Sequence, residues 1–200
     1  MLLRSVALAR SCRYAVLACC LASAPLAATA AAVPDGGESA SVILHRAEDQ
    51  ARAEHKNILL EFGASWCVNC RLYDRFLADP RMHALMSRAF VFVTMDTGES
   101  PKDKKHANTP GGVDFEDSVG GKDAGWPFLV ILNASGRPVV DSDRPDAKAK
   151  TGKSNIGYPF APEEIDWFVE MLRRGAPSLN AEDRGQVHAW LAAFASGQRH

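Results

Sequence analysis

Apolar residues recur at two different spacings along this chain, and the spacing changes from one segment to the next. Helical spacing predicts long helices over residues 39–55, 67–77, 162–174 and 180–195. Short, nearly continuous apolar runs predict buried strands over residues 57–62, 89–95 and 128–132, with a hairpin partner at 138–141. Asp79-Pro80 predicts a further short helix, because Asp suits the cap and Pro the first helical position. The alternation of helices and strands indicates an α/β domain.

The first residues have the organisation of a secretory signal peptide. Arg4, Arg10 and Arg13 give a positive start without an acid, and an apolar stretch and an alanine-rich tail follow. Small residues offer a cleavage site after Ala30 or Ala32. Because the apolar stretch is short for a membrane span, we expect no stable span and a periplasmic or secreted mature protein.

Cleavage of this leader removes every cysteine except Cys67 and Cys70. A single closely spaced pair with no spare cysteine suits an oxidising compartment. The alternative for the leader is a lipoprotein with its lipid on Cys19, but Leu17 fits poorly just before the small residue Ala18. We therefore favour cleavage without lipidation.

The remaining chain is long enough for one domain with a hydrophobic core. We expect a signal peptide over 1–30, a flexible lead-in over 31–41, and a domain with a C-terminal helical extension over 42–200. The formal net charge is −1, and removal of the basic leader makes it more negative. This balance gives no electrostatic reason to expect a nucleic acid or an acidic membrane surface as a partner.

The segment Cys67-Val68-Asn69-Cys70 carries the clearest chemistry, because it stands where a predicted strand gives way to a predicted helix. One helical turn places both sulfurs within bonding reach. The first sulfur lies at the helix N-terminus, where free N–H groups and the helix dipole favour a thiolate. This arrangement favours reversible disulfide exchange. The alternatives are a static disulfide and half of a zinc site, but neither His83 nor His106 shows paired spacing, so we expect no metal.

Three motifs in this order resemble thioredoxin-like proteins. They are Trp66-Cys67-Val68-Asn69-Cys70 after a strand, Asp79-Pro80 after the following helix, and Gly125-Trp126-Pro127 before an apolar strand. The likeness is particularly to the C-terminal thioredoxin domain of the disulfide interchange protein DsbD. It implies the thioredoxin fold, a central mixed β-sheet flanked by helices. The helix over 180–195 is extra to that fold, and we expect it to pack back on the domain rather than to present a partner surface.

The resemblance also implies a catalytic role for three residues. Cys67, exposed at the helix start, is expected to attack a substrate disulfide, and Cys70, one turn deeper, to resolve the mixed disulfide. Glu61 precedes Cys67 by the spacing at which thioredoxins place a buried acid. A carboxyl in an apolar strand has a raised pKa, so Glu61 is expected to accept the proton of Cys70. The alternative is an acid that faces solvent at the edge of the sheet.

Trp66, Trp126 and Pro127 are the expected substrate-binding residues. The resemblance implies a cis bond before Pro127, whose missing N–H leaves the neighbouring backbone free for a substrate strand. Trp126 is bulkier than the residue expected before such a proline, so it is expected to narrow the substrate groove or tune the redox poise. Trp66 either shields the cysteines from one side or has only a packing role.

The sequence thus predicts an exported thiol–disulfide oxidoreductase that reduces protein disulfides. It contains no nicotinamide or flavin motif, so we expect no cofactor. We expect the electrons to come from a membrane dithiol donor. Oxidase or isomerase action is the nearest alternative. A non-catalytic, thiol-based metal-binding or chaperone module is an alternative of another class.

Two polar segments have no firm assignment. Residues 97–124 look helical only over 113–119, and they either border the site or form a solvated surface loop. Residues 143–159 form a second polar loop whose role stays open.

Overall fold

The computed structural model describes residues 37–197, so the expected signal peptide and most of the expected lead-in lie outside the described residues. The helices are α1 (Ala40–Glu54), α2 (Val68–Ala78), α3 (Pro80–Met86), α4 (Gly112–Ser118), α5 (Pro162–Gly175) and α6 (Ala181–Ala195). The strands are β1 (Asn57–Gly63), β2 (Phe90–Asp96), β3 (Phe128–Leu132), β4 (Pro138–Asp141), β5 (Asp143–Pro145) and β6 (Lys153–Asn155). None of the helices between residues 37 and 197 has both the length and the apolar character needed to cross a membrane.

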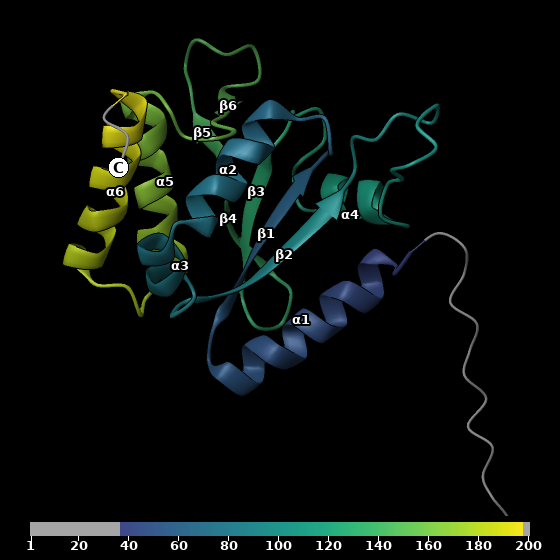
Figure 1. Ribbon diagram of the computed structural model, residues 1–200, viewed down its shortest axis with the longest axis horizontal. Coiled ribbons are helices and arrows are strands. Elements are labelled where there is room, and N and C mark those ends of the chain that lie inside the picture. Colours follow the sequence, from purple (N-terminus) through teal and green to yellow (C-terminus); the bar gives the residue numbers. More distant parts are fainter. Residues whose placement is uncertain (1–36, 198–200) are drawn as a thin grey trace, which may run out of the picture. The chain divides into compact units, whose positions relative to one another are not determined.

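The main sheet is mixed, with the strand order β2-β1-β3-β4 (Figure 1). β1 pairs parallel to β2 and antiparallel to β3. Phe62 near the end of β1 lies opposite Phe128 at the start of β3. This register brings the residues after β1 and the residues before β3 to the same end of the sheet, which is where the cysteines and Pro127 are found.

Each face of the sheet is covered by its own helices, because successive strand residues point to opposite faces. Ile58, Leu60 and Phe62 pack in one cluster with α1, while Leu59 packs in the other with α2, α3, α5 and α6. Figure 1 shows α1 and the pair α5 and α6 separated by the strands. The predicted mixed sheet flanked by helices is confirmed.

The helix starts follow the capping chemistry of the sequence. Cys67 caps α2, and the Asp79 carboxylate accepts from the backbone N–H groups of Arg81 and Met82 at the start of α3. Asn180 caps α6, accepting from the N–H of Asp183. These caps explain why helix boundaries predicted from periodicity agree with the structure within a few residues.

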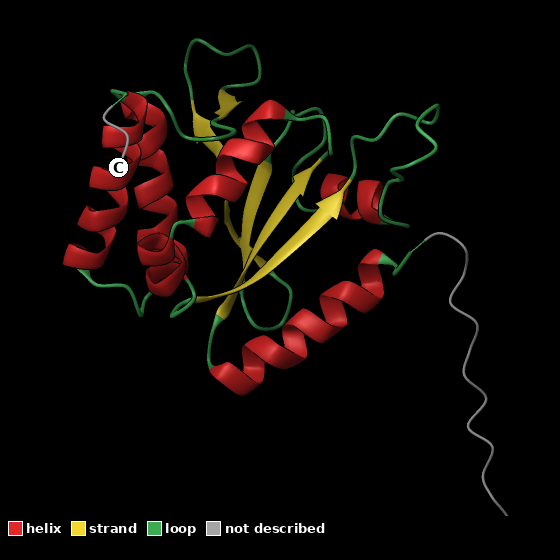
Figure 2. Ribbon diagram, in the orientation of Figure 1, coloured by secondary structure: helices red, strands yellow, loops and turns green. Residues whose placement is uncertain are grey.

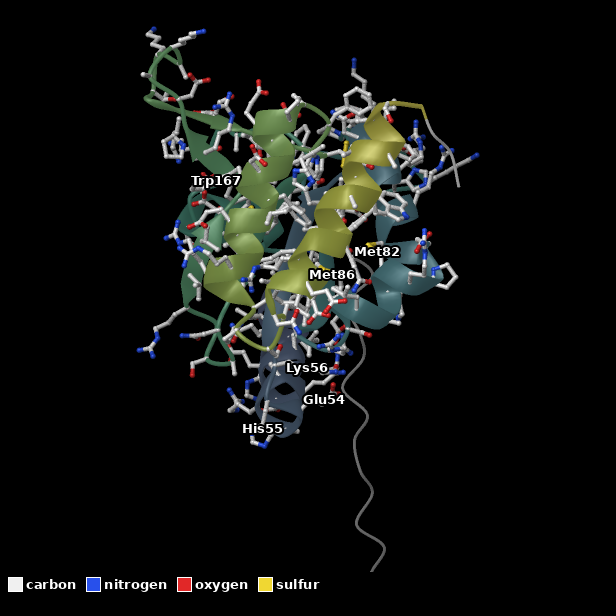
Figure 3. The ribbon with its side chains drawn as sticks, turned by 90° about the vertical axis from the view of Figure 1, so that its left-hand side faces the viewer. Glu54, His55, Lys56, Met82, Met86 and Trp167 are labelled. Atoms are coloured by element: carbon white, nitrogen blue, oxygen red, sulfur yellow. A yellow bond between two sulfur atoms is a disulfide. The ribbon has the colours of Figure 1, made fainter. Side chains whose placement is uncertain are left out.

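The C-terminal helix α6 packs on the domain, as expected. Val187 and Leu191 are buried in the cluster formed with α2, α3 and α5. The Arg88 guanidinium donates to both carboxylate oxygens of Asp183, at 3.0 and 2.9 Å. Figure 3 shows Met82 and Met86 of α3 where that helix faces α6. The helix is therefore part of the core rather than a free surface.

Replacing Leu191 with alanine is expected to lower the free energy of unfolding by about 3 kcal/mol. The side chain is 1% exposed, so its removal loses apolar burial and leaves a cavity. Urea denaturation of the oxidised protein measures the loss. Gln186→Ala, at an exposed position of the same helix, is the control and should change stability little. Equal stability of the two variants would contradict the packing of α6.

The polar segment 143–159 contains a small hairpin that the sequence analysis did not predict. β5 and β6 pair antiparallel, with Asp143 opposite Asn155, and form a separate two-stranded sheet. Figure 2 shows this hairpin at the same end of the main sheet as the start of α2. The strands are short and polar, so they carry no apolar alternation by which a strand could be recognised.

Candidate active site

Cys67 and Cys70 form a disulfide at the start of α2, with their Cα atoms 5.3 Å apart. Cys67 is the N-cap residue of the helix, and its Sγ accepts the backbone N–H of Cys70 at 3.1 Å. In the reduced protein the same N–H and the helix dipole would stabilise a Cys67 thiolate. The local structure therefore provides what a reactive thiol needs.

The expectation that Cys67 is exposed is wrong for this oxidised structure. Cys67 is only 5% exposed, and Cys70 is buried to a similar degree. The physical reason is Trp126, whose side chain packs against the small cluster of Ala64, Cys67 and Cys70. The Trp126 side chain therefore covers part of the cysteine pair.

Trp126 is held by the segment that follows β2. Its indole N–H donates to the Thr97 hydroxyl at 3.1 Å. A Cβ added at Gly98 would lie 2.9 Å from ring atoms of Trp126, so the indole lies directly on the backbone of this glycine. Trp66 is 54% exposed and donates from its indole N–H to the Gly98 carbonyl at 2.9 Å. Its ring meets Trp126 edge to face, with centroids 5.7 Å apart.

Glu61 lies beneath the pair, on the sheet face that α2 covers. A Cβ added at Gly63 would lie 3.0 Å from Cys70 Sγ and 3.6 Å from Glu61 Oε1, which places both groups around one point. Glu61 is 4% exposed, so the alternative of a solvent-facing acid is wrong. Burial raises the pKa of Glu61 to about 8, and the negative charges of Asp74 and Asp96 act in the same direction.

The Trp126–Pro127 peptide bond is cis, as predicted. A Cβ added at Gly157 would lie 3.8 Å from Pro127 Cδ and 3.9 Å from the Asn69 side chain. The proline loop, the residues between the cysteines and the segment after β6 therefore meet at one place.

The start of segment 97–124 borders this site, which decides between the two alternatives for that segment. The Glu99 carboxylate is buried and accepts from the backbone N–H of Ser65, and from its hydroxyl at 3.1 Å. The same part of the segment carries a group of potential metal ligands, in which atoms of Glu99, Asp103 and His106 lie within 4.8 Å of one another. It is the only group of that kind within residues 37–197, and neither cysteine belongs to it.

A family model described as thioredoxin-like matches residues 42–134. The domain thus has a thioredoxin-like fold, and residues 42–134 are similar to thioredoxin-like proteins. The matched residues include β1, the Cys67–Cys70 pair, the start of α2 and the Trp126-Pro127 loop. A comparison with curated proteins finds no match.

Solved structures similar to the thioredoxin-like domain include a disulphide isomerase from Xylella fastidiosa Temecula1, with 27% identity, 54% of this chain and 76% of that chain covered, and a TM-score of 0.44. The DsbH oxidoreductase has 18% identity, covers 68% of this chain and 83% of its own, and gives a TM-score of 0.40. The oxidised C-terminal domain of Neisseria meningitidis DsbD has 20% identity over 67% of this chain and 97% of its own, with a TM-score of 0.39.

Sequence reasoning missed several residues that build the site of the thioredoxin-like domain. Gly63 leaves room for the Cys70 sulfur, and Thr97 and Gly98 hold the two indoles. A glycine directly after an apolar strand and just before a cysteine pair is a usable signal of close approach. Nothing in the sequence signals Thr97 and Gly98, because their role depends on where a polar loop folds back.

Proposed function

We propose that this protein is an exported thiol–disulfide oxidoreductase that reduces disulfides of other proteins. The observation that carries the proposal is the Cys67–Cys70 disulfide at the helix start, with Cys67 Sγ bonded to a backbone N–H. The buried Glu61 on the inner side of the pair and the cis-proline loop on the other supply a proton acceptor and a place for substrate backbone.

The first step is attack of the Cys67 thiolate on one sulfur of a substrate disulfide. A new sulfur–sulfur bond forms between Cys67 and the substrate, and the other substrate sulfur leaves as a thiolate that takes a proton from water. Cys67 reacts first because its sulfur receives the N–H of Cys70 and lies at the positive end of α2.

The second step releases the substrate. Cys70 loses its proton, and its thiolate attacks the Cys67 sulfur of the mixed disulfide. The Cys67–Cys70 bond forms, the bond to the substrate breaks, and the second substrate thiol is freed. Two electrons have then passed from the cysteine pair to the substrate. The ionised form of Glu61 can take the Cys70 proton, and because the pKa of Glu61 is about 8, this form is a minor fraction at neutral pH and grows toward pH 8.

Return to the dithiol state needs electrons from another thiol. We propose that a membrane-embedded protein dithiol supplies them, because the sequence carries no nicotinamide or flavin motif. The support for export is the organisation of the N-terminal sequence, in which basic residues precede an apolar stretch and small residues. Proteins with disulfides are the proposed substrates.

The reduction potential of the Cys67–Cys70 pair tests this proposal. The mature protein is equilibrated in thiol buffers of known potential, and its free thiols are counted by mass tagging. A value near about −270 mV, as in thioredoxin, is the expected result for a reductase.

Other values would overturn the direction or the chemistry. A potential near about −120 mV indicates an oxidase, and one below about −300 mV a static structural disulfide. The non-catalytic alternative is tested in the same preparation by adding a protein disulfide to the reduced protein. Metal binding without disulfide reduction would favour that alternative.

A further inference from the structure

The unpredicted hairpin β5–β6 is connected to the proline loop by one side chain, Asn155. Its Nδ2 donates to the Gly125 carbonyl at 2.9 Å and to the Pro127 carbonyl at 3.1 Å. These two carbonyls stand on either side of Trp126. A single amide group therefore fixes the backbone on both sides of the residue that covers Cys67.

The orientation of this amide is set by its other partners. Asn155 Oδ1 accepts the hydroxyl of Ser142 at 2.7 Å and the backbone N–H of Gly157 at 3.1 Å. Ser142 is fully buried and itself accepts the N–H of Leu129 in β3, at 2.9 Å. Because a backbone N–H must meet oxygen and a carbonyl must meet N–H, only one orientation of the amide satisfies all four bonds of Asn155.

The network joins the small hairpin to the sheet and to the site. Through Ser142 it is anchored on β3, and through Gly125 and Pro127 it reaches the loop that carries Trp126. Gly157, which shares the same amide, adopts φ +54° and lies against Pro127 and Asn69. A residue with a side chain is disfavoured there by the backbone conformation, because its φ is positive.

We propose that Asn155 is a positioning residue that holds Trp126 over the cysteine pair. The hydrogen bonds from Asn155 to the Gly125 and Pro127 carbonyls hold the loop that contains Trp126. The Trp126 indole in turn limits access to Cys67. The β5–β6 hairpin is then the element that sets how readily a disulfide reaches the thiolate. This role rests on the proposed redox function of the same site, but the position of Trp126 can be measured without turnover.

The substitution Asn155→Asp isolates the donor function. Aspartate keeps the shape and the oxygen that accepts from Ser142 and Gly157, but it turns a second oxygen toward two carbonyl oxygens. Asn133→Asp is the matched control. Asn133 Oδ1 also accepts two backbone N–H groups, at 2.9 and 3.1 Å, in the turn at the other end of β3. Urea denaturation of both variants establishes that they are folded.

Two readouts follow the indole. The first is the rate at which iodoacetamide alkylates Cys67 in the reduced protein. It is measured on the high-pH plateau of the pH profile, where the Cys67 thiol is fully ionised. We expect Asn155→Asp to raise it about tenfold, the factor that corresponds to about 1.4 kcal/mol. The second is the rise in tryptophan fluorescence on reduction, because a disulfide quenches an indole packed against it. We expect this rise to fall to less than about half in Asn155→Asp.

The proposal is overturned if either readout in Asn155→Asp equals that of Asn133→Asp. Should Asn155→Asp fail to fold, Asn155→Ala removes the same donor without adding a charge and is judged by the same two readouts. Failure of the proposed function looks different: the unchanged protein then fails to reduce a protein disulfide, while the two readouts still separate the variants.

Discussion

Replacing Cys67 with serine is expected to abolish disulfide reduction, with a loss of more than about 10³-fold in rate. Cys67 is the capping residue of α2, where the Cys70 N–H and the helix dipole favour a thiolate. A serine hydroxyl at the same place stays protonated near neutral pH and is a poor nucleophile for sulfur. The measurement is reduction of a protein disulfide by the pre-reduced variant, followed by the appearance of substrate thiols.

The matched variant is Cys70→Ser, which keeps the attacking thiol and removes the resolving one. It should form a mixed disulfide with the substrate and then stop, giving a covalent complex on a non-reducing gel that a thiol reagent releases. Cys67→Ser should give no such complex. Activity retained by Cys67→Ser, or a complex formed through Cys70 alone, would overturn the assignment of Cys67 as the attacking residue.

The regular elements of the fold could be predicted from the sequence because each carries its own local signal. The strand at 128–132 is a continuous apolar run, and the short helix after Asp79 is indicated by Asp79-Pro80. The cis bond before Pro127 was also predictable, though only through the resemblance to thioredoxin-like proteins. The secondary structure of this strand and this short helix is therefore determined by residues that are close together in the sequence.

The errors concern features that distant residues decide. Cys67 is buried because Trp126 packs against it, and that contact spans many residues of sequence and depends on Thr97 and Gly98. Asn155 lies in a three-residue polar strand without apolar alternation, so its link to the proline loop has no local signal. The spacing of the two cysteines predicted their redox chemistry, but it did not predict the burial of Cys67.

Glu61 shows how the sheet register converts a sequence position into chemistry. It shares its sheet face with Leu59, beneath α2, and both its carboxyl and the Cys70 sulfur lie next to Gly63. Burial in this position raises the pKa of Glu61 to about 8. Ionisation of a buried acid lowers the free energy of unfolding of the protein. The same raised pKa suits the acid to accept a proton.

The substitution Glu61→Gln is expected to stabilise the oxidised protein at high pH and to slow its turnover. The folded protein keeps the Glu61 proton up to about pH 8, whereas the unfolded chain releases it near the ordinary value of 4.5. The free energy of unfolding of the natural protein therefore falls as pH rises between these values. The glutamine amide of the variant does not ionise, so the variant should be more stable above pH 8 by roughly 4 kcal/mol.

Urea denaturation at about pH 5, 7 and 9 measures this difference, with Glu182→Gln at an exposed position of α6 as the control. The gain should be small at the lowest pH, should grow toward the highest, and should be absent in the control.

In turnover, loss of the proton acceptor should slow release of the mixed disulfide by about 10²-fold. A merely structural role would leave that step unchanged, because a more stable protein with an intact cysteine pair has no reason to resolve its substrate more slowly. A gain in stability that does not depend on pH would instead show that the pKa of Glu61 is not raised in the folded protein. The proposed transfer of the Cys70 proton to Glu61 would then lose its basis.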